Sequence, residues 1–184
     1  MTTEVSQLAL QAVVLRRTFH DGNVTRYPES HFLDIVVDGR ALSDSLPGSR
    51  GLVTPLNRAW LPGVERAIDE LLGVRPADGL DIGRIFLFVC GACGDLACGA
   101  VTARLQVGTE LTTWSQFAWE NGYEPPEPIE NAPASLAFET AQYEDALAGA
   151  IGRLRLLPYD ELAHHGRRFL WPWQWGWRLP KNGD

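Results

Sequence analysis

The stretch RIFLFV at residues 84–89 decides the fold class, because it is a nearly continuous apolar run of strand length. Such a run predicts a central strand that is buried on both faces. Working outward, residues 100–107 alternate between apolar and polar side chains and predict a half-buried strand. Residues 111–119 predict a third strand after a Gly-Thr turn. These three segments therefore predict an antiparallel meander.

The flanking sequence supplies a hairpin and two helices. Residues 8–17 and 31–37 predict two further strands, joined as a hairpin by a longer loop with a turn at His20-Asp21-Gly22-Asn23. Helical spacing of apolar residues predicts one helix over 62–72, which Gly73 ends, and another over 140–154, which Thr140 caps. Residues 41–63 and the proline-rich segment 124–135 are expected to be irregular. The predicted class is α+β: a mainly antiparallel sheet with one or two packed helices.

Length and charge limit the classes of protein that the chain can represent. Its 184 residues suit a single domain over 1–184, with a tryptophan-rich C-terminal segment, 165–184, packed on it. Its net charge is −7 and it has no run of basic residues, which argues against general nucleic-acid binding. Lys181 is the only lysine, which disfavours a P-loop or a Schiff-base enzyme. There is no apolar stretch of membrane-spanning length and no apolar leader, so a cytoplasmic protein that does not enter membranes is expected.

The chemistry-bearing motif is the loop CGACGDLACG, residues 90–99, which holds all three cysteines of the chain: Cys90, Cys93 and Cys98. Two cysteines separated by two residues can bind one tetrahedral metal, as in half of a zinc knuckle. The glycines at 91, 94 and 99 are expected to let the backbone curl with positive φ so that the sulfurs meet. The expected metal is zinc, because thiolates favour it.

Zinc needs a fourth ligand, and the sequence leaves its identity open. The candidates are His164, His165, His20, His31, Asp95 and water. A site closed by histidine would be structural, whereas a site with water would be open and suited to catalysis. Two further interpretations stand beside metal binding: three buried thiols, or a redox disulfide between Cys93 and Cys98. Asp95 is expected to be a turn residue that accepts hydrogen bonds from nearby backbone amides.

Aromatic residues form two further features. In the predicted strand 111–119, alternation places Phe117 and Trp119 in the core and Trp114 on the opposite face. Trp114 and Glu120, which comes directly after this strand, are thus candidate ligand- or partner-binding residues. For Glu120 a surface carboxylate is the favoured interpretation. A second candidate surface is formed by tryptophans at every second position near the C-terminus, which share one side of an extended chain. They are Trp171, Trp173, Trp175 and Trp177. A tail that covers an apolar sheet face is the favoured interpretation of this strip.

The string FVCGACGDLACGAVT (residues 88–102), followed by WSQFAWENGY (114–123) and later by Phe138 and Tyr143, resembles a family of bacterial proteins common in actinobacteria. Members are often labelled hypothetical proteins or, loosely, oxidoreductases. The resemblance covers the middle third of the chain. It implies no established activity and carries over no catalytic residue.

Three functional hypotheses follow. The first is a non-catalytic binding or accessory protein, such as a toxin-immunity or self-protection partner, with a structural metal in the Cys loop. Its acidic charge would steer it toward a basic protein partner. The second is an enzyme that uses the Cys loop as an open metal site or as a thiol/disulfide couple. The third is a small-ligand carrier that uses the tryptophan strip as an aromatic wall.

Overall fold

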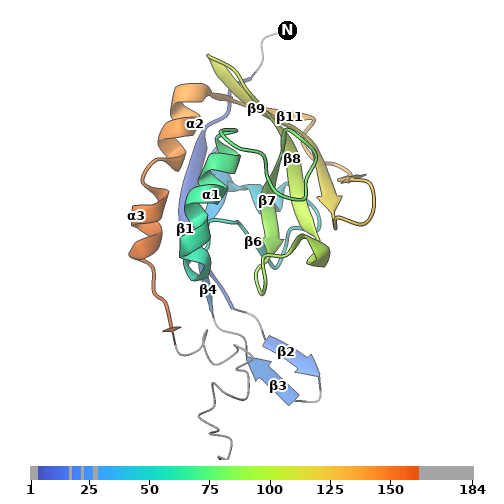
Figure 1. Cartoon of the computed structure of the whole chain (residues 1–184), viewed down its shortest axis with the longest axis vertical. Coiled ribbons are helices and arrows are strands. Elements are labelled where there is room, and N and C mark those ends of the chain that lie inside the picture. Colours follow the sequence, from blue (N-terminus) through green and yellow to red (C-terminus); the bar gives the residue numbers. More distant parts are fainter. Residues whose placement is uncertain (1–3, 17, 22, 27–28, 162–184) are drawn as a thin grey trace, which may run out of the picture.

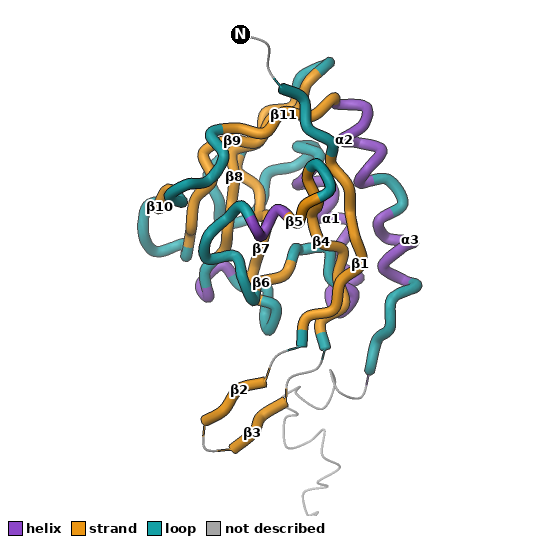
Figure 2. Tube along the Cα trace, turned by 180° about the vertical axis from the view of Figure 1, so that it is seen from behind, coloured by secondary structure: helices purple, strands orange, loops and turns teal. Residues whose placement is uncertain are grey.

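The computed structural model describes residues 4–16, 18–21, 23–26 and 29–161 of the chain. Three β-sheets, of six, three and two strands, and three α-helices make up this part (Figure 1). The helices lie along one side, and the six-stranded sheet lies on the other, as the view from behind also shows (Figure 2). The α+β class predicted from the sequence is confirmed.

The predicted meander forms the centre of the six-stranded sheet, in the order β10-β9-β8-β7-β6, with β11 paired to β9. Its strands are β6 (Leu52–Val53), β7 (Arg84–Cys90), β8 (Ala100–Val107), β9 (Leu111–Glu120), β10 (Glu127–Pro128) and β11 (Ser135–Glu139). β7 is buried along both faces, as its continuous apolar run predicts. β10 and β11 were not anticipated, because β10 is only two residues long and β11 follows directly on the proline-rich loop.

The predicted N-terminal hairpin is confirmed, because β1 (Leu8–Leu15) pairs antiparallel with β4 (Ser30–Val37). The short strand β5 (Arg40–Ala41) completes a three-stranded sheet in the order β1-β4-β5. The loop between β1 and β4 contains a separate two-stranded hairpin, formed by β2 (Thr18–Asp21) and β3 (Asn23–Arg26). The predicted turn therefore lies at the tip of this small hairpin.

One hydrophobic core joins the two larger sheets to the helices. Helix α1 (Leu61–Leu71) begins with Pro62 in its first turn and is followed by Gly73 at φ 69°, as predicted. The second predicted helix is instead two helices, α2 (Thr140–Leu147) and α3 (Ala150–Arg155). The break falls at Gly149, whose φ is 72°. Thr140 does not cap α2; its hydroxyl donates to the carbonyl of Gly108 instead.

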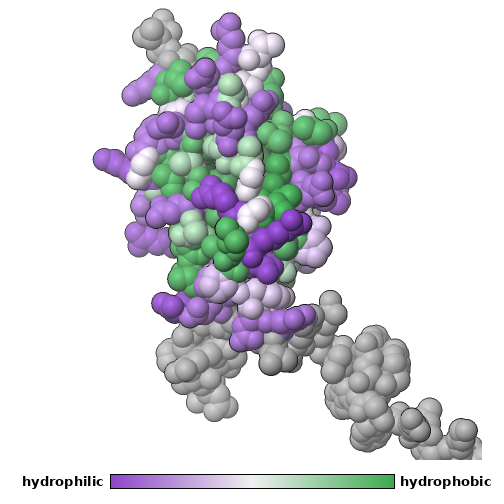
Figure 3. Space-filling view, turned by 90° about the vertical axis from the view of Figure 1, so that its left-hand side faces the viewer, coloured by the Kyte–Doolittle hydropathy of each residue, from purple (hydrophilic) through white to green (hydrophobic). Residues whose placement is uncertain are grey.

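Three short 3₁₀ helices complete the described elements: η1 (Leu42–Asp44), η2 (Arg58–Trp60) and η3 (Leu96–Cys98). η1, β6 and η2 lie within the segment that was expected to be irregular. On the helix-bearing side of the molecule, apolar surface is broken up by hydrophilic side chains (Figure 3). Among the described residues, no helix combines the length and the apolarity that crossing a bilayer requires.

Candidate metal centre

The Cys loop connects the two central strands β7 and β8, and its conformation is fixed by hydrogen bonds within the loop. The N–H of Gly94 donates to the carbonyl of Cys90 at 2.8 Å, and the N–H of Gly99 donates to the carbonyl of Leu96 at 2.7 Å. Asp95 accepts a 2.9 Å hydrogen bond from the N–H of Ala97, as predicted for a turn residue. Gly94 and Gly99 have positive φ values of 69° and 90°, whereas Gly91 does not. The expectation for Gly91 was therefore wrong, and two left-handed positions are enough to fold the loop.

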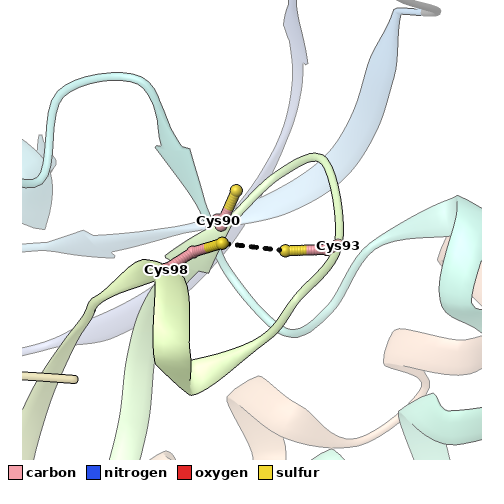
Figure 4. Close-up of side chains that lie close together, drawn as sticks. All are labelled: Cys90, Cys93 and Cys98. Carbon is pink, nitrogen blue, oxygen red and sulfur yellow. Dashed lines mark hydrogen bonds between the residues drawn. The ribbon is translucent and has the colours of Figure 1, made fainter. Parts of the chain in front are cut away.

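The loop brings its three cysteine sulfurs together (Figure 4). All three ligand atoms lie within 4.8 Å of one another, and the Sγ atoms of Cys93 and Cys98 are 3.4 Å apart. Zn–S bonds of about 2.3 Å at tetrahedral angles place sulfurs about 3.8 Å apart, so the observed cluster is close to the size that one zinc ion needs. Cys93 and Cys98 are exposed and Cys90 is half-buried. The three cysteines are therefore positioned to bind a metal.

Backbone amides stabilise negative charge on the cluster. Burial opposes ionisation of Cys90, but hydrogen bonds from the N–H groups of Ala92 and Cys93, together with the neighbouring thiols, outweigh it, so the pKa of Cys90 is lowered. Burial raises the pKa of Cys93 to about 11. A hydrogen bond from the N–H of Asp95 opposes this rise, and the neighbouring thiols add to it. Cys90 therefore ionises more readily than Cys93. A bound cation would favour thiolates at the remaining positions as well.

The structure places some of the candidate fourth ligands and not others. Among the described residues, the cluster that could hold a metal consists of the three cysteines alone. His31 lies elsewhere, on β4, with its Nε2 3.4 Å from a carboxylate oxygen of Glu29. His20 lies in β2. His164 and His165 are outside the described residues, as is the tryptophan strip of Trp171, Trp173, Trp175 and Trp177.

Apolar contacts hold the Cys loop against three other segments. An added Cβ on Gly94 would lie 3.4 Å from the indole of Trp60, the last residue of η2. Leu96 reaches to within van der Waals distance of the Cβ positions of Gly79, before β7, and of Gly122, after β9. The backbone of Gly99 lies against the ring of Trp119. These contacts could not be predicted from the sequence, because they join segments that are far apart in the chain.

Glu120 is buried rather than on the surface, since it is only 7% exposed. It forms an ion pair with Arg84 and accepts a 2.5 Å hydrogen bond from the hydroxyl of Thr102. Arg84 donates as well to Thr102 at 2.5 Å and to the carbonyl of Gln116 at 3.1 Å. The expectation of a surface carboxylate was wrong, because it took no account of Arg84 on β7, which lies two strands away across β8. Its buried ion pair removes the basis for Glu120 as a partner-binding residue.

Trp114 lies in the main core with Phe117, not on the opposite face. Gln116 has a φ of 49°, and the pairing of β8 with β9 shifts register at this point. Such a β-bulge adds one residue and reverses the alternation beyond it, which brings Trp114 and Phe117 to the same side. Trp114 is 1% exposed, and its indole N–H donates to the hydroxyl of Tyr143. Trp114 is therefore a core residue, and its buried side chain is not accessible to a partner.

The geometry defines the class of site: a cluster of three thiols on a loop between two core strands of an α+β protein. Comparisons with protein-family models, with curated proteins and with solved structures each found no match.

Proposed function

We propose that the Cys loop binds a structural zinc ion in a small acidic protein that acts by binding a protein partner. The assignment of a metal rests on the three sulfurs, which lie within 4.8 Å of one another. The N–H groups that lower the pKa of Cys90 support the same assignment, because metal-bound thiolates are commonly stabilised by such contacts. Zinc with three thiolates carries a net charge of −1, which suits a site partly open to water.

The position of the loop explains what the metal would do. The loop contacts η2 through Gly94, and Leu96 contacts the segments before β7 and after β9. A metal that fixes the three cysteines would therefore hold these segments in one arrangement. This is the effect of a structural site, which contributes binding energy to the folded state.

Metal analysis of protein purified without a histidine tag tests this assignment. One equivalent of zinc is expected, with cysteines that react slowly with a thiol reagent until a chelator removes the metal. Cys93→Ser and Cys98→Ser should each lower the zinc content well below one equivalent. Ala92→Ser is the matched control, because it places the same side chain at an exposed position of the same loop and should leave the zinc bound. If the wild-type protein neither copurifies with zinc nor binds added zinc, the proposal is refuted.

The partner-binding part of the proposal is supported by charge and by one apolar surface. The net charge of −7 favours a partner with a basic surface, as for the immunity protein of a basic toxin. Val74 and Ile82 are 73% and 88% exposed, and both line a groove of about 460 Å³ between α1 and the start of β7. Exposed apolar side chains around a groove are typical of interaction surfaces.

The test of this part is copurification from cells that encode the protein. A basic protein recovered with the wild type and with Val5→Asp, but lost with Ile82→Asp, would support it. Val5 is the matched control because it is 52% exposed and does not line the groove. Recovery with all three forms would refute this surface as the interface.

A thiol/disulfide couple is the second candidate function, favoured by the 3.4 Å between the sulfurs of Cys93 and Cys98. In this reaction the two thiols lose two electrons and two protons to glutathione disulfide, which is reduced to two glutathione molecules. A defined midpoint in glutathione buffers, retained by Cys90→Ser and abolished by Cys98→Ser, is the expected result. Metal-bound thiols that stay reduced across the range would exclude it.

A further inference from the structure

A groove of about 310 Å³ borders the Cys loop, with Cys93 and Gly94 in its wall. The wall also includes apolar side chains from η2 and from β7, of which Trp60 and Phe86 are half-buried aromatic rings. The volume lies at the small end of the range for ligand sites, large enough for a planar ring with one substituent. The apolar lining is formed by Pro55, Trp60, Ala67, Phe86 and Val89.

Trp60 connects this groove to the metal-binding loop. Its indole lies in van der Waals contact with the Cβ position of Gly94, next to Cys93 in the chain. It packs in a small apolar cluster with Phe86 and with the buried Val89, which immediately precedes Cys90. A ring packed against Trp60 and Phe86 would thus lie beside Cys93, the cysteine that lines the groove. Aromatic rings favour such neighbours in edge-to-face or offset stacked arrangements.

The charges around the groove favour a neutral ligand. Arg66 donates to Glu70 at 2.8 Å and forms an ion pair with Asp78, so one guanidinium faces two carboxylates. The net charge of these three groups is −1, and zinc with three thiolates would add another −1. A carboxylate or a thiolate ligand would meet repulsion here. A neutral nitrogen base avoids this repulsion and is a preferred ligand of zinc.

We propose that this groove receives an imidazole-class ring, which packs against Trp60 and Phe86 and supplies the fourth ligand to the metal held by Cys90, Cys93 and Cys98. The proposal rests on the proposed function, because it needs a metal in the Cys loop. The ring is that of a free substituted imidazole.

Cobalt(II) in place of zinc provides the test, because its visible absorption reports the ligands of a tetrahedral site. The probes are imidazole and 4-phenylimidazole, added to the cobalt-loaded wild type and to the variant with His164→Ala and His165→Ala. A saturable spectral change in the wild type identifies a free ligand. A change in the double variant alone would show that a histidine side chain already holds the fourth position, which overturns the proposal. No change in either form overturns the proposal.

The role of the groove has its own readout. We expect 4-phenylimidazole to bind about tenfold more tightly than imidazole, because the added ring contacts Trp60 and Phe86. Trp60→Ala should remove most of this preference, whereas Trp60→Phe should keep part of it. Ile82→Ala is the matched control, since Ile82 is an exposed apolar residue of the other groove. An equal preference in Trp60→Ala would refute the groove as the binding site.

The two proposals fail in different ways. If cobalt and zinc do not bind the wild type, the metal site itself is wrong. If cobalt binds with a thiolate spectrum but no imidazole probe changes it in either histidine background, the metal site stands and the groove does not supply its fourth ligand.

Discussion

Gly99 ends the Cys loop with a φ of 90° and a ψ of 143°, in contact with Trp119. An alanine Cβ there would overlap Cζ2 of the indole and lie 2.7 Å from Cε2. Gly99→Ala therefore combines backbone strain with a steric clash. Gly48 separates the two effects, because its φ is 88° and an added Cβ would meet nothing within 4 Å.

The magnitude follows from these two contributions. A non-glycine residue in this backbone region costs about 1–3 kcal/mol. Overpacking against a well-packed side chain adds about 1–3 kcal/mol. We therefore expect Gly99→Ala to lower the free energy of unfolding by about 2–6 kcal/mol, and Gly48→Ala by about 1–3 kcal/mol. In a chain of this size, each kcal/mol lowers the Tm by about 2–4 °C.

Urea unfolding followed by far-UV circular dichroism measures both variants under the same conditions. The clash is isolated by adding Trp119→Leu, which gives the Cβ room. In the Trp119→Leu background, the cost of Gly99→Ala should fall to that of Gly48→Ala. If Gly99→Ala costs no more than Gly48→Ala with Trp119 in place, or if Trp119→Leu rescues nothing, the packing argument is refuted.

Three further predictions concern buried polar groups. Burial raises the pKa of Asp34, so the folded state binds a proton more readily than the unfolded state, and stability falls as pH rises from the unfolded pKa through the folded one. Asp34→Asn should remove this slope and stabilise the protein at pH 7; a urea midpoint that depends on pH equally in both forms would contradict this. Arg84→Ala should lower the free energy of unfolding by about 3–5 kcal/mol because it leaves Glu120 buried without its partner, and Glu120→Gln in the same chain should recover part of the loss. Additive costs in the double variant would show that the two groups do not interact. The hydroxyl of Tyr143 donates to a backbone carbonyl at 2.6 Å, so Tyr143→Phe should cost about 1–3 kcal/mol, whereas the 81% exposed Tyr123 should tolerate the same change. Equal effects at the two tyrosines in thermal unfolding would refute the role of this hydrogen bond.

The regular elements could be predicted from the sequence because their patterns are local. The apolar run at 84–89 and the alternation at 100–107 gave β7 and β8, and the helical spacing with Pro62 and Gly73 gave α1. The site residues Cys90, Cys93 and Cys98 were also predictable, since a loop of ten residues confines all three. Local patterns are enough where the chain folds on itself within a few residues.

Two errors came from features that local patterns do not contain. The bulge at Gln116 reverses the alternation of β9 and moves Trp114 into the core, and no residue type announces it. Glu120 is buried because Arg84, 36 positions earlier in the chain, lies within reach across the sheet. The groove at Trp60 likewise joins η2 to the Cys loop only in three dimensions. Strand register and long-range pairing decide these positions.

The contacts of the Cys loop limit what metal loss can do to the fold. Trp60 and Trp119 already pack against the loop, and Leu96 of the loop packs against neighbouring segments. The main core beneath the helices contains none of the three cysteines. The metal-free protein should therefore keep its sheets, unlike a zinc finger, which unfolds without its metal. We expect chelator treatment to leave the far-UV circular dichroism nearly unchanged while hydrogen exchange rises across residues 90–99 and around Trp60. Global loss of structure on metal removal would show instead that the metal, and not the packing of Gly99 on Trp119, holds β7 to β8 at this end of the sheet.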